Sequence, residues 1–204
     1  MLFRERKDIV MARIGFKTAK YNKIVGGTYA SLTSNAVPVF EKVVDEKFAP
    51  EYNTAELYAN DGIAECDYSF KKGTLSLTVA DDDDKLCAEL LGNTVGASGG
   101  EVTSNIEDTA PEFGYGHIIP KMVGGARKYK VEFFPRVKFT KITSDNKTRG
   151  ENVEFSTTAI EGTVMPLETA INGLKIGDWE KHSTFATLAE AETYLDELLT
   201  PAEA

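Results

Sequence analysis

The chain has 204 residues, a mass of 22.3 kDa and a formal net charge of −9 at pH 7. Its 42% hydrophobic and 10% aromatic residues are enough to bury a sizeable core, which excludes global disorder. No apolar stretch approaches the roughly 18 residues of a membrane-spanning helix, so no membrane partner is expected, and the acidic balance argues against a broad nucleic-acid-binding surface.

The N-terminal part of the chain carries weak structural signals. Residues 1–10 are half charged and are interpreted as an N-terminal extension, before a cleaner strand pattern that opens at Met11. Gly26-Gly27 indicates a turn, and Ser31–Pro38 has the composition of a loop. Between Ile24 and Tyr52 the hydrophobic pattern is weaker than in the rest of the chain.

A period of two dominates the sequence, which predicts a β-rich protein. Asp61-Gly62 lies between two strand-like flanks and indicates a hairpin turn. From Gly73 to Ala80 apolar and polar residues alternate, as in a half-buried antiparallel strand. The apolar face of this predicted strand holds Leu75, Leu77 and Val79.

Residues 81–91 predict a helix that begins with four aspartates and ends at Gly92. Aspartate accepts hydrogen bonds from the unpaired N–H groups of a first helical turn and favours its positive dipole end. The aspartates could instead bind calcium, but a calcium loop needs glycine at its sixth position, where Leu86 stands, so capping is favoured. The apolar residues on one side of this helix are Leu86, Leu90 and Leu91.

The longest strand pattern runs from Arg127 to Ile142. Because proline cannot donate a hydrogen bond to a ladder, Pro135 predicts an edge position or a bulge midway along this strand. A loop over Thr143–Glu151 and a strand over Asn152–Met165 follow, with a parity change near Ile160 that indicates a second bulge. In the longest strand one parity holds the apolar Tyr129, Val131, Phe133, Val137 and Phe139, and the other holds Lys128, Lys130, Glu132, Arg136 and Lys138.

A second helix is predicted near the C-terminus. Thr187 and Glu190 have the spacing of a capping box, in which each side chain bonds the other residue's backbone N–H. Pro201 ends the helix. The apolar stripe behind the cap is Leu188, Ala191, Leu195 and Leu198.

Positive charge is concentrated between residues 121 and 149. This segment holds nine Lys or Arg and two Asp or Glu, a net charge of +7, so the rest of the chain carries −16. Two interpretations stay open: a solvated face of a long strand, or a patch that meets an acidic partner surface such as another copy of this chain.

The sequence contains no recognisable catalytic, cofactor or metal motif. His117 and His182 have no nucleophile motif beside them, so both are interpreted as structural or solvated. The glycine pairs lack the spacing of a phosphate-binding loop. Cys66 and Cys87 are expected to pack in the core, and no disulfide framework or zinc-finger pattern is present.

Several segments together resemble one protein family. Residues 54–95, TAELYANDGIAECDYSFKKGTLSLTVADDDDKLCAELLGNTV, are similar to the central signature of the major tail proteins of long-flexible-tailed phages (siphophages). The resemblance lies in the order and spacing of segments and spans residues 11–165; residues 1–10, 24–48 and 167–204 depart from it. The other matching segments, in order, are MARIGF at 11–16, APEFGYGHIIPK at 110–121, KYKVEFFPRVKF at 128–139 and TRGENVEFSTTAIEGTV at 148–164.

The resemblance implies a mainly β chain with a tail-tube fold: a β-sandwich flanked by an α-helix, with a long loop that reaches a neighbouring ring. It implies three parts: the extension 1–10, a tail tube domain over 11–165, and a C-terminal tail with a helix over 166–204. Subunits of this family form six-membered rings that stack into a tube. The implied location is the virion tail, after assembly in the host cytoplasm.

The resemblance also implies partners but no chemistry. The expected partners are further copies of the chain, the tape-measure protein inside the tube, the tail terminator and the distal tail (baseplate) proteins. Double-stranded DNA is expected to pass through the lumen without specific binding. A basic lumen would hold DNA tightly, so basic residues are expected elsewhere, at a contact between subunits or rings. The residues proposed for that contact are Lys128, Lys130, Arg136 and Lys138.

Two other classes of protein stay open from the residues alone. A monomeric all-β binding module that recognises a carbohydrate or a protein explains the composition, but not the ordered set of matching segments. An enzyme would need two carboxylates at a fixed separation in a cleft, and Glu65 with Asp67, or the run 81–84, are the candidates. No catalytic activity is expected.

Overall fold

The computed structural model describes residues 11–13, 15–32, 36–59, 62–80, 83–96, 100–144 and 157–201. The fold is mainly β, with 55% of residues in strands and 13% helical, and has two helices, one of them near the C-terminus. This agrees with the predicted β-sandwich and flanking helix. The extension 1–10, the hairpin turn residue Asp61 and most of the predicted loop after Thr143 lie outside the described residues.

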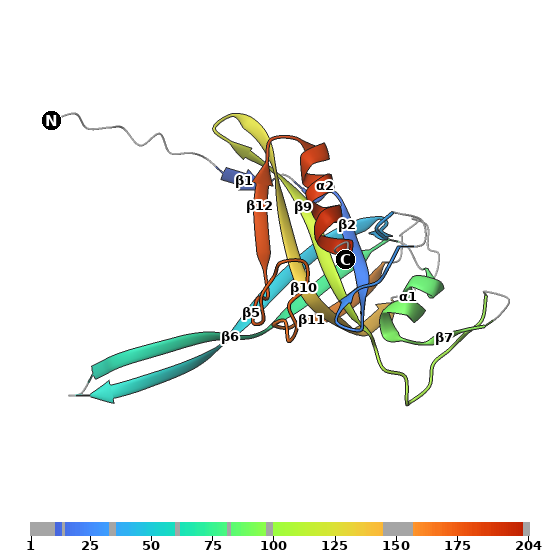
Figure 1. Cartoon of the computed structure of the whole chain (residues 1–204), viewed down its shortest axis with the longest axis horizontal. Helices are drawn as coiled ribbons and strands as arrows, with labels where there is room; N and C mark the ends of the chain where they lie inside the picture. The colour runs from blue at the N-terminus through green and yellow to red at the C-terminus, as the bar shows by residue number, and fades with distance from the viewer. Residues whose placement is uncertain are drawn as a thin grey trace, which may run out of the picture.

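Ten of the described strands form one antiparallel sheet (Figure 1). Its main order is β3-β2-β9-β10-β11-β6-β5; β1 pairs with β9, β4 with β2 and β12 with β10. The strands of this sheet are β1 (Met11–Arg13), β2 (Ala19–Val25), β3 (Thr28–Tyr29), β4 (Val39–Phe40), β5 (Val43–Ala59), β6 (Gly62–Val79), β9 (Glu112–Val123), β10 (Ala126–Ser144), β11 (Thr158–Val164) and β12 (Lys181–Phe185). The other elements are α1 (Asp84–Leu91), the paired β7 (Thr94–Val95) and β8 (Val102–Thr103), and α2 (Leu188–Leu199).

The central strand β10 changes its partners midway along its length. On one side it pairs with β9, with a register shift between Phe134 and Val137 that confirms the bulge predicted at Pro135. On the other side it pairs with β12 over Tyr129–Phe133 and with β11 from Val137 onward. The bulge reverses the side-chain alternation, because Phe133 packs in one hydrophobic core and Val137, four residues further along, packs in the other.

Because of this bulge, the predicted assignment of the apolar side chains of β10 to one face is wrong. The sequence placed the apolar residues 129–139 of one parity on a single face. In the structure Val131 and Phe133 belong to the core beneath α2, whereas Val137 and Phe139 belong to the core beneath β6. The inserted residue reverses the alternation, so one strand contributes to two cores on opposite faces of the sheet.

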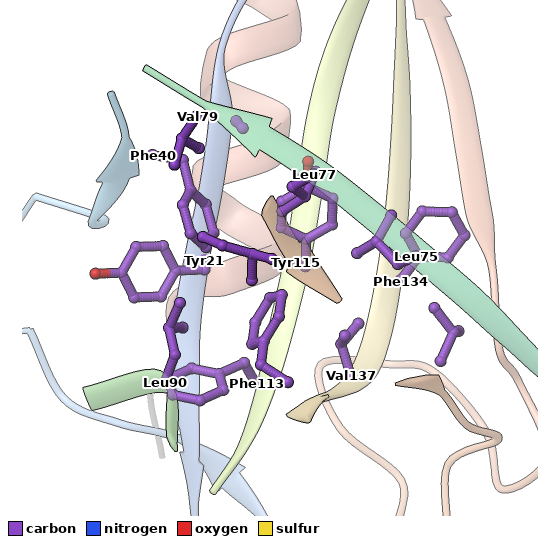
Figure 2. Close-up of a cluster of buried hydrophobic side chains, with 14 residues drawn as sticks. Tyr21, Phe40, Leu75, Leu77, Val79, Leu90, Phe113, Tyr115, Phe134 and Val137 are labelled. Atoms are coloured by element: carbon purple, nitrogen blue, oxygen red, sulfur yellow. The ribbon is translucent and has the colours of Figure 1, made fainter. Parts of the chain in front are cut away.

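The first core lies where the sheet curls so that β6 crosses β9 and β10 (Figure 2). Leu75, Leu77 and Val79 of β6 are at most 3% exposed, which confirms the alternation predicted for this strand. They face an aromatic cluster in which Phe40 packs on the rings of Tyr21, Tyr115 and Phe139. Leu90 of α1 closes this core and is fully buried.

The second core is covered by α2. Ala191, Leu195, Leu198 and Leu199 of this helix are buried against Ile118 and Val131 of the sheet, while Leu188 packs at the margin. The predicted capping box is confirmed, with Thr187 and Glu190 bonding each other's backbone N–H groups, and the helix ends just before Thr200.

The first helix is shorter than predicted but has the predicted chemistry at its ends. It begins at Asp84, capped by the Asp83 carboxylate, which accepts from the Lys85 N–H at 3.0 Å. Gly92 ends it in the left-handed conformation, with φ at 77°, and a Cβ there would lie 2.4 Å from the Thr109 carbonyl oxygen. Asp81 and Asp82 lie outside the described residues.

One strand is longer than its sequence pattern indicated, and one predicted bulge is wrong. The 17-residue strand β5 begins at Val43, within the segment whose hydrophobic pattern is weak. The described part of β11 has no bulge near Ile160: its buried residues alternate without interruption and its register with β6 is continuous. The irregularity lies on the partner strand instead, between Phe139 and Lys141 of β10.

Candidate assembly surface

The most exposed element is the far half of the β5–β6 hairpin. The two strands pair from Val43 and Val79 at the root to Ala59 and Gly62 at the far end. Strand β11 covers β6 only along Gly73–Val79, so beyond this point the hairpin has no further strand beside it in the described chain. We call residues 51–59 and 62–70 the arm. We call the rest of the described residues the body, and Figure 1 shows the arm as a two-stranded ribbon that projects from it.

The arm presents apolar side chains to solvent. Tyr52 is 49% exposed, Leu57 59% and Tyr68 63%. An isolated two-stranded hairpin is marginally stable in water, and exposed large apolar side chains often mark a contact surface. These residues were not singled out from the sequence, although the arm lies in the segment that carries the family resemblance.

The root of the arm is held firmly on the body. The Trp179 ring stacks on Phe70, with centroids 4.0 Å apart and planes 5° apart, and Trp179 also stacks on Phe48. Phe48 in turn fills the space beside Gly73, where a Cβ would lie 2.3 Å from the Phe48 ring. These aromatic contacts fix the direction in which the arm leaves the sheet.

Three acidic residues lie on adjacent rungs of the arm. Asp67 pairs with Ala55, Glu65 pairs with Leu57, and Glu56 pairs with Cys66, all exposed. Because alternate residues of a strand share a face, Glu65 and Asp67 lie on the same face as Leu57. This face therefore combines an exposed apolar side chain with two carboxylates.

The four residues proposed for a contact between subunits are divided between two environments. The Lys130 ammonium pairs with Glu132 of the same strand, and Lys130 lines a cleft beside His117. Arg136 lies beyond the bulge, among residues such as Leu167 that belong to the α2 side. Lys128 and Lys138 are half-buried. The bulge thus separates the pair 128 and 130 from the pair 136 and 138.

Arg136 is engaged within its own chain. Its guanidinium donates to both carboxylate oxygens of Glu112, at 2.9 and 2.7 Å, and to the Pro166 carbonyl at 3.1 Å. It also lies 2.7 Å from the Glu168 carboxylate. Hydrogen bonds from Arg136 to Glu112 raise the pKa of the guanidinium above its usual value, and burial opposes this increase. This network ties β9 and β10 to the segment before α2.

His117 sits in a buried polar cluster at the root of the arm. Its ring is 2% exposed, with Nδ1 3.1 Å from a Glu46 oxygen and Nε2 3.4 Å from a Glu132 oxygen. The buried Nδ1 atom has no hydrogen-bond partner among the described residues. The Tyr115 hydroxyl donates to Glu46 at 2.7 Å. Glu46 belongs to β5, so the cluster links the arm's root to β9 and β10.

The electrostatics of this cluster favour a charged Glu132. Burial raises the pKa of the Glu132 carboxyl, but hydrogen bonds from His117 and Lys130 outweigh burial and lower this pKa to about 2. Burial, with the Glu46 carboxylate beside it, raises the pKa of the Tyr115 hydroxyl well above its usual value. The cluster lines an open cleft of about 440 Å³ that also includes Phe16.

The remaining candidates from the sequence occupy exposed or structural positions. His182 is exposed, 3.7 Å from Glu180. Cys66 lies exposed on the arm, so the prediction that it packs in the core is wrong, whereas Cys87 is half-buried. Glu65 and Asp67 lie on the exposed arm rather than in a deep cleft. Among the described residues no group of three or more His, Cys, Asp or Glu could hold a metal ion.

Comparison with known proteins gives no family assignment: no protein-family model and no curated protein matches this chain. In the described part of the structure neither helix is long and apolar enough to cross a membrane. Function is therefore inferred from the sequence pattern and from the geometry of the fold.

Proposed function

We propose that the protein is a structural tail tube protein of a long-flexible-tailed phage, without catalytic activity. Six copies form a ring, rings stack into a tube in the virion tail, and the tube encloses the tape-measure protein before it conducts the genome. The tail terminator and the distal tail proteins bind at its two ends. Double-stranded DNA passes through the lumen without specific binding.

The arm is the observation that carries this proposal. A firmly rooted hairpin that exposes Tyr52, Leu57 and Tyr68 has the form expected of a segment that reaches another subunit. It also lies within the residues that resemble the central signature of the family. The sheet supports the same role, because β3 and β5 end its main order, and pairing across subunits would protect such edges.

Negative-stain electron microscopy of the purified protein, with light scattering for mass, tests the proposal. We expect hollow rings or tubes whose channel is wide enough for duplex DNA. A protein that stays a 22.3 kDa monomer at every concentration and salt tested would contradict self-assembly.

The second candidate function is a monomeric β binding module. The open cleft of about 440 Å³ beside His117 favours it, since ligand sites are concave and carry a few convergent polar groups. A monomer that binds a glycan or peptide, and loses this binding when the cleft is altered at Glu46, would support the module over the tube.

A further inference from the structure

The arm is acidic along its whole length. Residues 52–70 contain four acidic residues and no Lys or Arg. Glu65 and Asp67 are exposed on the face that also presents Leu57, which is 59% exposed. This face is therefore both apolar and negative, and it suits a partner surface that is positive.

The far end of the β9–β10 hairpin has the opposite charge. Residues 121–130 contain four basic residues and no Asp or Glu. Backbone register places Lys128 opposite Lys121 and Arg127 opposite Met122. Arg127 is exposed and Lys128 half-buried, and within the described chain neither of the two forms an ion pair. We call residues 121–130 the hairpin end.

These two surfaces lie at different ends of the molecule. Figure 1 shows the arm extending to the lower left and the hairpin end at the top, drawn in yellow. Since the arm's root is fixed by Trp179, one chain cannot fold its arm onto its own hairpin end. Two arms are equally unsuited to each other, because both are negative. The complementary charges can meet only between different copies.

We propose that the arm of one copy docks on the hairpin end of another, with Glu65 and Asp67 facing Arg127 and Lys128. The contact is heterologous, since different surfaces of the two copies meet, and so it propagates from copy to copy. Leu57 covers the apolar stems of the basic side chains and the neighbouring Met122. The inference deepens the proposed function, on which it rests, by naming the two surfaces that join subunits.

Charge reversal in the full-length chain tests this docking. One variant carries Glu65→Lys and Asp67→Lys, and the other carries Arg127→Glu and Lys128→Glu. Each variant alone is expected to lose assembly by about tenfold or more at low salt, measured by sedimentation and by cross-linking between copies. An equal mixture of the two variants is expected to recover assembly, because each reversed arm then meets a reversed hairpin end.

Matched controls separate this specific effect from the change in overall charge. Lys85→Glu and Glu107→Lys reverse exposed residues outside both surfaces and should assemble like the unchanged chain. Circular dichroism checks that every variant folds. If a reversal variant does not fold, the neutral changes Glu65→Gln with Asp67→Asn, and Arg127→Gln with Lys128→Gln, are used instead and should weaken assembly in the same direction.

The outcomes distinguish the docking from the proposed function. If the reversed variants form hollow tubes as the unchanged chain does, the docking is wrong and the tube proposal stands. If copies cross-link through these charges but form no ring or tube, the docking stands and the tube proposal fails. An unchanged chain that does not associate at any salt concentration overturns both.

Discussion

At the scale of single residues, the buried cluster at the root of the arm is the least expected feature. A histidine between two carboxylates from other strands is stable inside a protein only when charges and hydrogen bonds compensate one another. Here His117 lies between Glu46 and Glu132, while Lys130 neutralises Glu132. The cluster therefore behaves as one unit whose strength depends on which members are charged.

This dependence predicts acid sensitivity. Because the folded protein lowers the pKa of Glu132 from 4.5 to about 2, the ionised carboxylate stabilises the fold above pH 4.5. That stabilisation falls as pH drops from 4.5 toward 2. We expect Glu132→Gln to lose about 1–3 kcal/mol of unfolding free energy at pH 7, and the difference from the unchanged chain to shrink below pH 3. Urea unfolding across this pH range measures it.

Glu107→Gln is the matched control for this experiment. Glu107 is exposed, so the unfolding free energy of the Glu107→Gln variant should change with pH in parallel with that of the unchanged chain. A Glu132→Gln variant whose deficit stays constant from pH 7 to pH 2.5 would show that the carboxylate contributes through packing rather than through its charge.

At the scale of elements, local signals found the helices and the central strands. Some signals act within a few residues of the chain and can therefore be recognised in the sequence. They are the capping residues of α2, the C-terminal glycine of α1 and the alternation in β6. Of β5, only the part next to Asp61-Gly62 was predicted as a strand. Its inner part, residues 43–51, was missed because its half-buried residues Val43, Glu46 and Phe48 are not regularly spaced. The burial of His117 depends on Glu46, far away in the chain, which no local pattern reveals.

The bulge in β10 is the instructive intermediate case. Pro135 correctly indicated where the ladder is interrupted. The sequence did not reveal that the side chains reverse there, because the apolar residues on both sides of Pro135 keep the same spacing. The candidate contact residues were assigned to one face on the basis of that spacing. Because the alternation reverses at the bulge, Lys130 and Arg136 lie in different surroundings in the structure.

Helix α1 gives a prediction at this scale. Leu90 is fully buried in the core beneath β6 and is the main anchor of the helix. Leu90→Ala should cost about 2–5 kcal/mol of unfolding free energy by leaving a cavity, and Leu90→Asp should prevent stable folding by burying a charge. Chemical denaturation and soluble yield measure the two effects. Lys85→Ala, at an exposed position of the same helix, is the control. A Leu90→Asp protein of normal stability would mean that α1 does not pack on this core through Leu90.

At the scale of the whole molecule, the body contains the residues that stabilise the fold, and the arm contains residues proposed for assembly. The two cores lie within the body, whereas every described side chain from Glu51 to Leu57 and from Glu65 to Ser69 is exposed. Removing these exposed residues should therefore leave the fold intact. The register allows a cut that keeps Phe70, which stacks on Trp179, because Asn53 lies opposite Ser69.

A variant that joins Asn53 to Ser69 through Asn-Gly tests this division, since this dipeptide favours a two-residue hairpin turn. We expect a folded protein whose melting temperature changes by only a few degrees and which does not form tubes. Calorimetry and electron microscopy measure the two properties. Tubes formed without the arm would contradict its role, and an unfolded product would mean that the arm stabilises the body.

The bulge at Pro135 has a consequence for how the body comes apart. Strand β10 supplies side chains to both cores, so a displacement of this strand would disturb the packing of both. The body should therefore lose its structure in a single cooperative step. Amide protons along the centre of β10 should exchange with solvent only through global unfolding, and equally slowly before and after the proline. In a subunit that has not yet assembled, proteases would thus be able to cleave the exposed arm, but they would reach the backbone of the two cores only after global unfolding.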